Sequence, residues 1–312
     1  KNFKKELQIP KDALYKGKPR SRIAYLCASK RMDWEPVAWT DFDGKNIVFT
    51  DIQKGPVMRV ATYERGRLRF WTDPFEINVS NEFHFFTPSD SVQDVTLFAK
   101  YTLRADEMFL NRMIGGTFEG SNDPDFREKE VLYLINEKPK RLQTVVQSYS
   151  SKPYRYVRYV GPKESHCNIA EVAFYTPNDT ASLKGKVMGT PGCFQKDGSH
   201  EYTNVFDGDV TTSFDYIESS GGWAGLDLGI PKQIEKIVYT PRSYDNYIRS
   251  GDKYELFYCT GNKWSSLGKQ LSEADSLTYK NVPRNVLLLL KNYSHGVQER
   301  VFICEDEKQN WK

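Results

Sequence analysis

Short runs in which apolar and polar residues alternate fill most of this chain. Between residues 33 and 86 the runs are PVAWTDF, NIVFTDI, VMRVATYE, RLRFWT and NEFHFF. Asp43-Gly44, Lys54-Gly55-Pro56 and Arg65-Gly66 separate them, and such residues favour tight turns. Because alternation with a period of two is typical of strands with one buried face, the region is expected to form a small antiparallel β-sandwich.

The segments on either side of this region are less regular. Residues 1–32 are basic and contain a single strand pattern, RIAYLCAS, so they are expected to be either a linker or an edge strand of the first sandwich. A polar break at 87–91 marks a boundary. The predicted division is therefore 1–32, 33–90, 91–178 and 179–312.

The last third of the chain carries the clearest strand patterns. WAGLDLG and IEKIVYT are predicted to be half-buried strands with a Gly-Ile-Pro turn between them. YELFYC is predicted as a third strand, with Gly261-Asn262 closing a hairpin into Trp264. Aromatic residues make up 14% of the chain, which also favours sheets over helices.

Several of these pieces together resemble a known family. FDGDVTTSF, W-x-x-LDLG, an I-x-x-I strand, an arginine-bearing loop, YELFY and a late Glu299 follow one another as in the discoidin domain, also called the coagulation factor V/VIII type C domain, of the galactose-binding-like superfamily. The resemblance covers about 180–312. It implies an all-β fold of jelly-roll sandwiches, in addition to the small N-terminal sandwich, and ligand binding through loops without chemistry.

A second, partial resemblance precedes the first. NRMIGGTFEGSNDPDF, LYLI, YRYVRYVGP and CNIAEVAFY are similar to the later half of another such module, with Glu171 in its closing strand. This copy lacks the D-G-x-x-x-T turn and the W-x-x-LDLG strand. We therefore expect a degenerate module at 91–178 and a complete one at 179–312, with strands from 33–86 as one way to complete the degenerate copy.

A cation site is predicted at the acidic turn of the complete module. Asp207, Asp209 and Thr212 place two carboxylates and a hydroxyl on a tight turn, a spacing suited to a hard cation. The resemblance implies a structural calcium there, with Glu299 as a further ligand from the last strand. The alternative is a plain hairpin turn capped by Thr212.

A ligand-binding loop is predicted close to the third strand of this module. Sugar sites combine a planar aromatic ring with polar groups that fix the orientation of the hydroxyls. The candidate residues lie in PRSYDNYIRSGD and NYSHGVQ, and they are Arg242, Tyr244, Asn246, Tyr247, Arg249 and His295. The alternative is that Arg242 belongs to a packing motif. Trp34, Trp39 and Trp71 are expected to pack in the core or at its edge, which we favour over a sugar platform.

Composition excludes several other functions. The net charge of +3 is spread along the chain, which argues against a nucleic-acid patch, and no apolar run approaches the ~20 residues of a membrane helix. Five widely spaced cysteines are expected to be buried free thiols. The four histidines are scattered and no catalytic motif occurs, so catalysis has little support.

The expected function is non-catalytic recognition of a glycan or glycoprotein by an exported protein that is secreted, periplasmic or on the cell surface. Similar multi-module stretches occur in exported proteins of Gram-negative gut bacteria, so this chain is expected to be the targeting part of a larger protein. Protein–protein adhesion or a spacer role is the alternative, and a glycan- or peptide-processing hydrolase with an unrecognised site is the second. The sequence does not indicate an oligomeric state.

Overall fold

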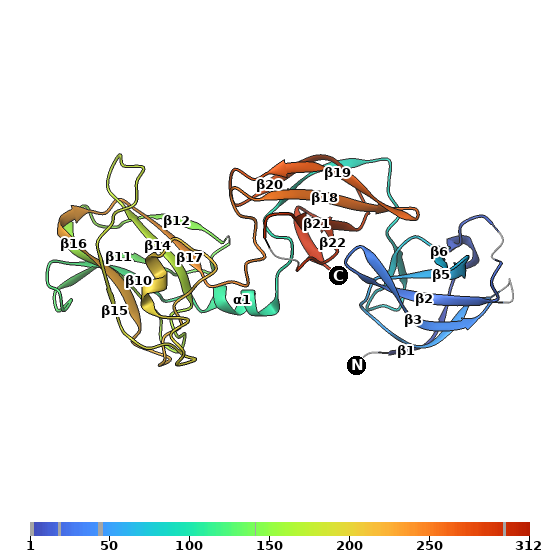
Figure 1. The fold of residues 1–312 in the computed structure, drawn as a ribbon, viewed down its shortest axis with the longest axis horizontal. Coiled ribbons are helices and arrows are strands. Elements are labelled where there is room, and N and C mark those ends of the chain that lie inside the picture. The colour runs from blue at the N-terminus through green and yellow to red at the C-terminus, as the bar shows by residue number, and fades with distance from the viewer. Residues whose placement is uncertain (1–2, 18–19, 43–45, 141, 296–297) are drawn as a thin grey trace. The chain divides into compact units, whose positions relative to one another are not determined.

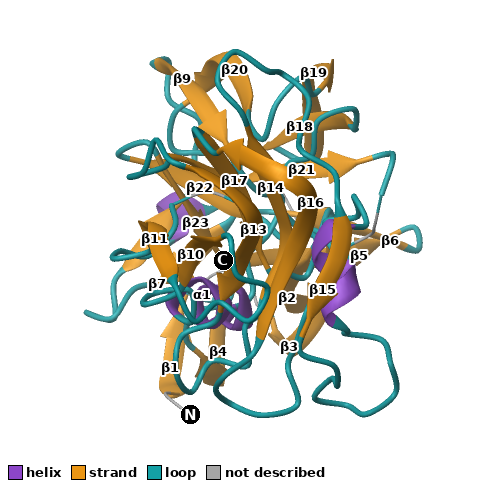
Figure 2. Ribbon diagram, turned by 90° about the vertical axis from the view of Figure 1, so that its left-hand side faces the viewer, coloured by secondary structure: helices purple, strands orange, loops and turns teal. Residues whose placement is uncertain are grey.

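The computed structural model describes residues 3–17, 20–42, 46–140, 142–295 and 298–312. Antiparallel strands form almost all of its regular structure, which confirms the all-β prediction (Figures 1 and 2). Within these ranges the helical elements are α1 (Arg104–Asn111) and the 3-10 turns η1 (Lys11–Ala13) and η2 (Tyr202–Phe206). The turn predicted at Asp43-Gly44 lies outside the described residues.

The chain divides into two compact units. Unit 1 comprises Lys1–Tyr101 and Ile248–Lys312, and unit 2 comprises Thr102–Tyr247. This division differs from the predicted boundaries, because the stretch 179–312, expected to be one complete module, is shared between the units. The reason lies in the strand pairing, which joins segments that are distant in sequence.

The first part of unit 1 is built from strands that lie before residue 86. Along the chain, its described residues form β1 (Phe3–Gln8), β2 (Ile23–Lys30), β3 (Asp33–Asp41), β4 (Val48–Gln53), β5 (Met58–Glu64), β6 (Arg67–Phe70), β7 (Phe75–Ile77) and β8 (Phe83–Phe85). The main sheet has the order β3-β2-β5-β7-β8, β6 also pairs with β5, and β1 pairs with β4. Residues 1–32 therefore supply two strands of this region and are not a linker. Leu26, Val60 and Phe75 are fully buried in its core.

The second part of unit 1 is built from strands on both sides of the unit 2 segment. They are β9 (Val92–Leu97), β18 (Lys253–Thr260), β19 (Lys263–Leu271), β20 (Leu277–Pro283), β21 (Leu288–Asn292), β22 (Phe302–Glu305) and β23 (Lys308–Trp311). One sheet has the order β19-β18-β21-β22-β23, and β20 pairs with β9. The predicted hairpin at Gly261-Asn262 is confirmed, since Thr260 pairs with Lys263 and Gly261 has a φ of 53°.

Unit 2 is a sandwich of two antiparallel sheets. Its strands are β10 (Thr117–Ser121), β11 (Lys129–Leu134), β12 (Thr144–Gln147), β13 (Pro153–Val160), β14 (Ile169–Tyr175), β15 (Lys186–Gly189), β16 (Trp223–Gln233) and β17 (Lys236–Pro241). The sheets have the orders β11-β10-β13-β16-β15 and β12-β17-β14. Phe118, Phe174 and Tyr239 belong to a single buried cluster, and burial of each such ring contributes about 1.5–3 kcal/mol.

The two partial resemblances meet inside this one sandwich. The RYVRY strand β13 pairs with the LDLG strand β16, with Val157 opposite Leu226. The closing strand β14 of the partial resemblance pairs with β17, with Ala173 opposite Val238. Segments expected to belong to two modules are thus complementary parts of unit 2.

The Gly-Ile-Pro turn predicted after LDLG is wrong. Strand β16 continues through Gly229 and Pro231 to Gln233. Gly229 takes a φ of 77°, and the register with β13 shifts between Tyr154 and Tyr156. The glycine therefore accommodates an irregularity within a strand instead of ending it.

The tryptophans and cysteines differ in their environments. Trp71 is buried as expected, whereas Trp39 is 68% exposed on β3. All five cysteines are free, as predicted, and only Cys304 is not fully buried. Among the described residues, no helix has the length and apolar character needed to cross a membrane.

Candidate functional site

Three loops of unit 2 meet where β14 begins and β17 ends. Ile169 lies opposite Pro241 at this end of the sheet. The backbone nitrogen of Arg242 donates to the Asn168 carbonyl at 2.9 Å, and Phe214 donates to the Ile169 carbonyl at 2.7 Å. The segments 161–168, 212–216 and 242–244 are thereby held side by side, and we call this loop cluster the turn-end site.

The centre of the turn-end site is a strained turn. His166, Cys167 and Asn168 have φ values of 56°, 72° and 46°, so three consecutive residues other than glycine adopt the left-handed conformation. This conformation is uncommon for such residues and persists only where surrounding contacts enforce it. Strain of this kind occurs preferentially at binding and catalytic sites.

Hydrogen bonds to the backbone hold the strained turn in place. The nitrogen of Tyr216 donates to the His166 carbonyl at 2.8 Å, and the Tyr159 hydroxyl donates to the Cys167 carbonyl at 3.2 Å. The His166 ring nitrogen Nδ1 lies 2.9 Å from the carbonyl oxygen of Tyr216. Since Nδ1 can only donate to a carbonyl, Nε2 of a neutral His166 is left as an acceptor.

A buried polar network lies directly behind the turn. The Asn168 side chain accepts a hydrogen bond from Nη1 of Arg112 at 3.0 Å and donates through Nδ2 to Asp215. The other carboxylate oxygen of Asp215 pairs with Arg242. Asn168 and Asp215 are 1% and 4% exposed, so their bonding is preorganised and shielded from water.

Two exposed aromatic rings flank the network. Tyr244 is 47% exposed and its ring centroid lies 5.7 Å from that of Phe109, over which the Arg242 guanidinium is placed at 4.7 Å. On another loop, Phe194 is 57% exposed and lies 5.0 Å from the His166 ring, at an angle of 73°. The nitrogen of Phe194 donates to the Asp215 carbonyl at 2.8 Å, which ties this loop to the same network.

The acidic turn of unit 2 lies beside Glu171, a carboxylate from the second, partial resemblance. Thr212 Oγ1 donates to Asp207 Oδ2 at 2.8 Å, and the nitrogen of Gly208 donates to Glu171 Oε1 at 2.8 Å. Burial, followed by the hydrogen bond with Asp207, raises the pKa of Glu171 to about 8. Two carboxyl groups thus meet in a partly buried place, where either a proton or a cation is needed to offset their repulsion.

The donors around the turn fit a hard cation in part. Asp207, Glu171 and the Thr212 hydroxyl supply side-chain oxygens, and Ca²⁺ also accepts backbone carbonyls and water. The Asp209 carboxylate instead caps Thr211, accepting from its nitrogen at 2.9 Å and its hydroxyl at 2.7 Å. In the described ranges no three His, Cys, Asp or Glu side chains gather as a metal site, so backbone and hydroxyl oxygens would have to complete the coordination.

The predicted ligand Glu299 and the acidic turn belong to different units. Glu299 belongs to unit 1, whereas Asp207, Asp209 and Thr212 belong to unit 2. The carboxylate that contacts the turn is Glu171. The physical reason is the pairing of β14 with β17, which brings the closing strand of the partial resemblance into the sandwich that contains the turn.

The predicted ligand residues also separate. Arg242 and Tyr244 lie in the turn-end site, but Asn246 is only 2% exposed and Tyr247 only 8%, so neither presents its side chain to a ligand. Burial raises the pKa of Tyr247, in keeping with a core position. Arg249 and His295 belong to unit 1, where His295 Nδ1 lies 2.8 Å from the buried Asp252.

Sequence reasoning missed Arg112, Asn168, Phe194 and Asp215. Asp215 lies three residues after Thr212 of the D-G-x-x-x-T turn, and Asn168 directly precedes the closing strand, so both lie beside motifs that the sequence does show. No pattern in the sequence around Asn168 or around Asp215 indicates that these two segments contact each other. The contact depends on the β-bridge between Ile169 and Phe214, which joins segments about 50 residues apart.

Ser213 and His200 of unit 2 lie within hydrogen-bond distance, as a catalytic nucleophile and its general base do. Ser213 Oγ lies 3.1 Å from His200 Nδ1. Ser213 is 3% exposed, so a substrate has no direct access to its hydroxyl. The pair therefore gives the hydrolase alternative no specific support.

Comparison with known proteins does not extend this picture, because no family model, no curated protein and no solved structure matches the chain.

Proposed function

We propose that the chain recognises glycans without chemistry, through the turn-end site of unit 2. The observation that carries this proposal is a pair of exposed rings, Tyr244 and Phe194, on loops that are both tied to the buried Asn168–Asp215 network. Exposed rings offer apolar faces to the apolar side of a sugar, and polar groups at fixed positions orient its hydroxyls. His166 of the strained turn and Arg112, which donates to Asn168 of the same turn, are only partly buried and are the polar groups proposed to contact the sugar.

The resemblance to the discoidin domain supports the same proposal. The acidic turn, the W-x-x-LDLG strand and the N-I-A-E-V closing strand lie in a single two-sheet sandwich. A shared fold by itself does not imply a shared function. Glycan binding, a role of the family, is therefore proposed for this chain on the geometry of the turn-end site. An exported location is proposed with it, because extracellular glycans would be accessible there.

Calcium is proposed as a structural ion beside this site. Asp207, Glu171 and Thr212 would hold it, replacing the proton that the two carboxyl groups otherwise share. The ion would fix the acidic turn, and so the start of segment 212–216, whose Asp215 belongs to the buried network.

A glycan array tests the proposal with the full chain. Tyr244→Ala and Phe194→Ala are expected to weaken binding about tenfold each, because stacking on an aromatic ring is worth about 0.5–1.5 kcal/mol. Tyr149→Ala is the matched control: Tyr149 is 62% exposed and pairs with Tyr133, outside the turn-end site. Glycan binding that survives both variants unchanged would contradict the assignment of the site.

Adhesion to another protein is the second candidate, and one feature of unit 1 favours it. Strand β3 lies at the edge of its sheet, and there Val37 is 60% exposed and Trp39 68%. Exposed apolar residues on an edge strand favour association with a further strand. A chain that binds no glycan on the array but captures proteins through β3 would support adhesion instead.

A further inference from the structure

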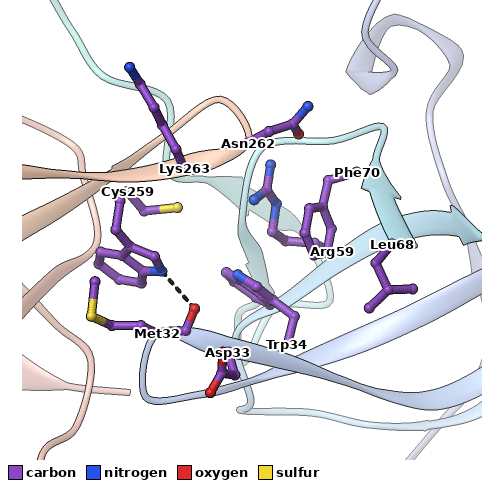
Figure 3. Close-up of a pocket in the computed structure, with 10 residues that line it drawn as sticks. Met32, Asp33, Trp34, Arg59, Leu68, Phe70, Cys259, Asn262 and Lys263 are labelled. Atoms are coloured by element: carbon purple, nitrogen blue, oxygen red, sulfur yellow. Dashed lines mark hydrogen bonds between the residues drawn. The ribbon is translucent and has the colours of Figure 1, made fainter. Parts of the chain in front are cut away.

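Unit 1 contains a cavity that none of the predicted ligand-binding or metal-binding residues lines. Its volume is about 290 Å³, and its walls come from the β2–β3 hairpin, from β5 and β6, and from the β18–β19 hairpin. Figure 3 shows Trp34, Arg59 and Phe70 facing Cys259 across this space. A cavity of this size accommodates a single six-membered ring with its substituents.

Aromatic rings make up much of the cavity wall. Trp34 and Phe70 lie with ring centroids 5.8 Å apart. Trp264 is fixed by a hydrogen bond of 2.9 Å from its Nε1 to the Met32 carbonyl, drawn as the dashed line in Figure 3. All three rings are only partly buried. Trp34 and Trp264 pack against a buried cluster that includes Cys259, and all three rings also line the cavity, where a ligand can contact them.

Arg59 supplies a buried positive charge at the same place. It is 1% exposed, and its guanidinium carbon lies 4.3 Å from the Phe70 centroid and 5.3 Å from that of Trp34. Nε donates to the Thr72 carbonyl at 3.0 Å, and Nη2 donates to the carbonyls of Thr72 and Gly261 at 2.9 and 2.6 Å.

The charge of Arg59 has no carboxylate partner among the described residues. The nearby Asp73 accepts hydrogen bonds from Tyr15 and Thr87 instead. The hydrogen bonds described for Arg59 come from Nε and Nη2, and Nη2 also donates to the Tyr15 hydroxyl at 3.4 Å. A buried cation satisfied only by carbonyls and a hydroxyl lacks the anion that usually offsets its desolvation.

The rim of the cavity adds a second cation. Lys263 and Asn262 are exposed and come from the β18–β19 hairpin, and Asp33 lies on the opposite hairpin. With Arg59, the lining side chains carry two positive charges and one negative charge. An anionic ligand is therefore favoured over a cationic or neutral one.

We propose that this cavity binds a carboxylated monosaccharide unit, with its carboxylate at Arg59 Nη1 and Lys263 and its ring against Trp34. The choice of a sugar over another ring acid rests on the glycan recognition proposed for unit 2, whereas the requirement for a ring and an anion comes from the cavity. The chain would then hold an acidic glycan at two separate sites.

The test is titration of the full chain with sodium glucuronate and sodium galacturonate, followed by tryptophan fluorescence. Both acids are expected to bind at least about tenfold more tightly than glucose and galactose, because the charge-assisted bond is worth more than a neutral one. Equal affinity for neutral and acidic sugars would overturn the proposal, and so would an absence of binding. Tighter binding of benzoate than of either uronate would overturn the assignment to a sugar.

Variants locate the binding. Trp34→Ala and Lys263→Gln are each expected to weaken glucuronate binding about tenfold, whereas Trp39→Ala, on the same strand but outside the cavity, leaves it unchanged. Glucuronate binding that survives both cavity variants would overturn the site. Tyr244→Ala separates the two proposals, since it is expected to weaken array binding while leaving glucuronate affinity at the cavity unaltered.

Discussion

At the residue scale, the properties of the acidic turn depend on Glu171, a residue distant in sequence. Asp207 and Thr212 form the hydrogen bond expected of a capped turn. Glu171 alone makes the place unusual, because it brings a second carboxyl group to Asp207 and accepts from the Gly208 nitrogen. The carboxylates of Glu171 and Asp207 therefore repel each other when both are ionised, which a simple capped hairpin would avoid.

This repulsion between Glu171 and Asp207 predicts that the stability of the folded chain depends on pH. The pKa of Glu171 rises from an ordinary 4.5 to about 8 on folding, so the folded chain retains a proton that the unfolded chain releases. Stability is then expected to fall as the pH rises from about 4.5 to 8 in calcium-free buffer. After allowance for partial exposure the loss is on the order of 1 kcal/mol, or roughly 4 °C in Tm.

Thermal melting with chelator and with Ca²⁺ measures both effects. Calcium is expected to raise the Tm at pH 8 more than at pH 5, because the ion binds the ionised carboxylates. Glu171→Gln is expected to remove both the pH dependence and the calcium effect, while Glu218→Gln removes an exposed charge of the same sign and changes neither. A wild-type Tm that is the same with chelator and with calcium at pH 8 would rule out the ion.

At the element scale, β16 joins the two partial resemblances. It lies between β13 and β15 in the five-stranded sheet, and its small residues allow close approach of the neighbouring backbone. A Cβ atom on Gly225 would overlap the Val157 carbonyl and come within 2.7 Å of the Arg158 Cβ. The glycine is therefore required by the pairing of β13 with β16.

Gly225→Ala is expected to destabilise unit 2 by about 2–4 kcal/mol, because the clash is with backbone that cannot move without breaking the sheet. Hydrogen exchange measures this loss strand by strand, with faster exchange expected in β13 and β16 than in β18 and β21 of unit 1. Gly221→Ala is the control: its Cβ meets nothing within 4 Å, and only its φ of 86° makes it costly. Equal losses in the two variants would show that the close approach is unimportant.

At the scale of the whole molecule, local patterns predicted the strands but not their partners. The alternation in YELFYC and YRYVRYV, and the Gly261-Asn262 turn, depend on neighbouring residues and were predicted correctly. Glu171 and Glu299 precede similar apolar stretches, so only long-range pairing decides which of them reaches Asp207. The contact of Asn168 with Asp215 also depends on long-range pairing, and local sequence patterns therefore did not predict it.

The pairing also makes unit 2 an insertion in unit 1. Strand β9 precedes the insertion and pairs with β20, which follows it, and the nitrogen of Ile248 donates to the Phe98 carbonyl at 2.9 Å. The points where the chain leaves and re-enters unit 1 are therefore adjacent. Within unit 2, the nitrogen of Tyr244 donates to Asp106 at 3.0 Å, so its own two ends are also adjacent.

Insertions with adjacent ends and a core of their own are expected to fold alone. The fragment 102–247 is predicted to melt cooperatively with the calcium response of the full chain, because its buried cluster lies entirely within that range. Unit 1 with a short Gly/Ser linker in place of 102–247 is predicted to keep the glucuronate affinity of its cavity, whose lining residues all lie outside the insertion. Circular dichroism and hydrogen exchange test whether each of the two proteins folds. Titration with glucuronate tests whether the unit 1 protein keeps the affinity of its cavity. A fragment 102–247 without protected amides would mean that unit 2 needs unit 1 to fold, and that the two proposed binding sites belong to one cooperative structure.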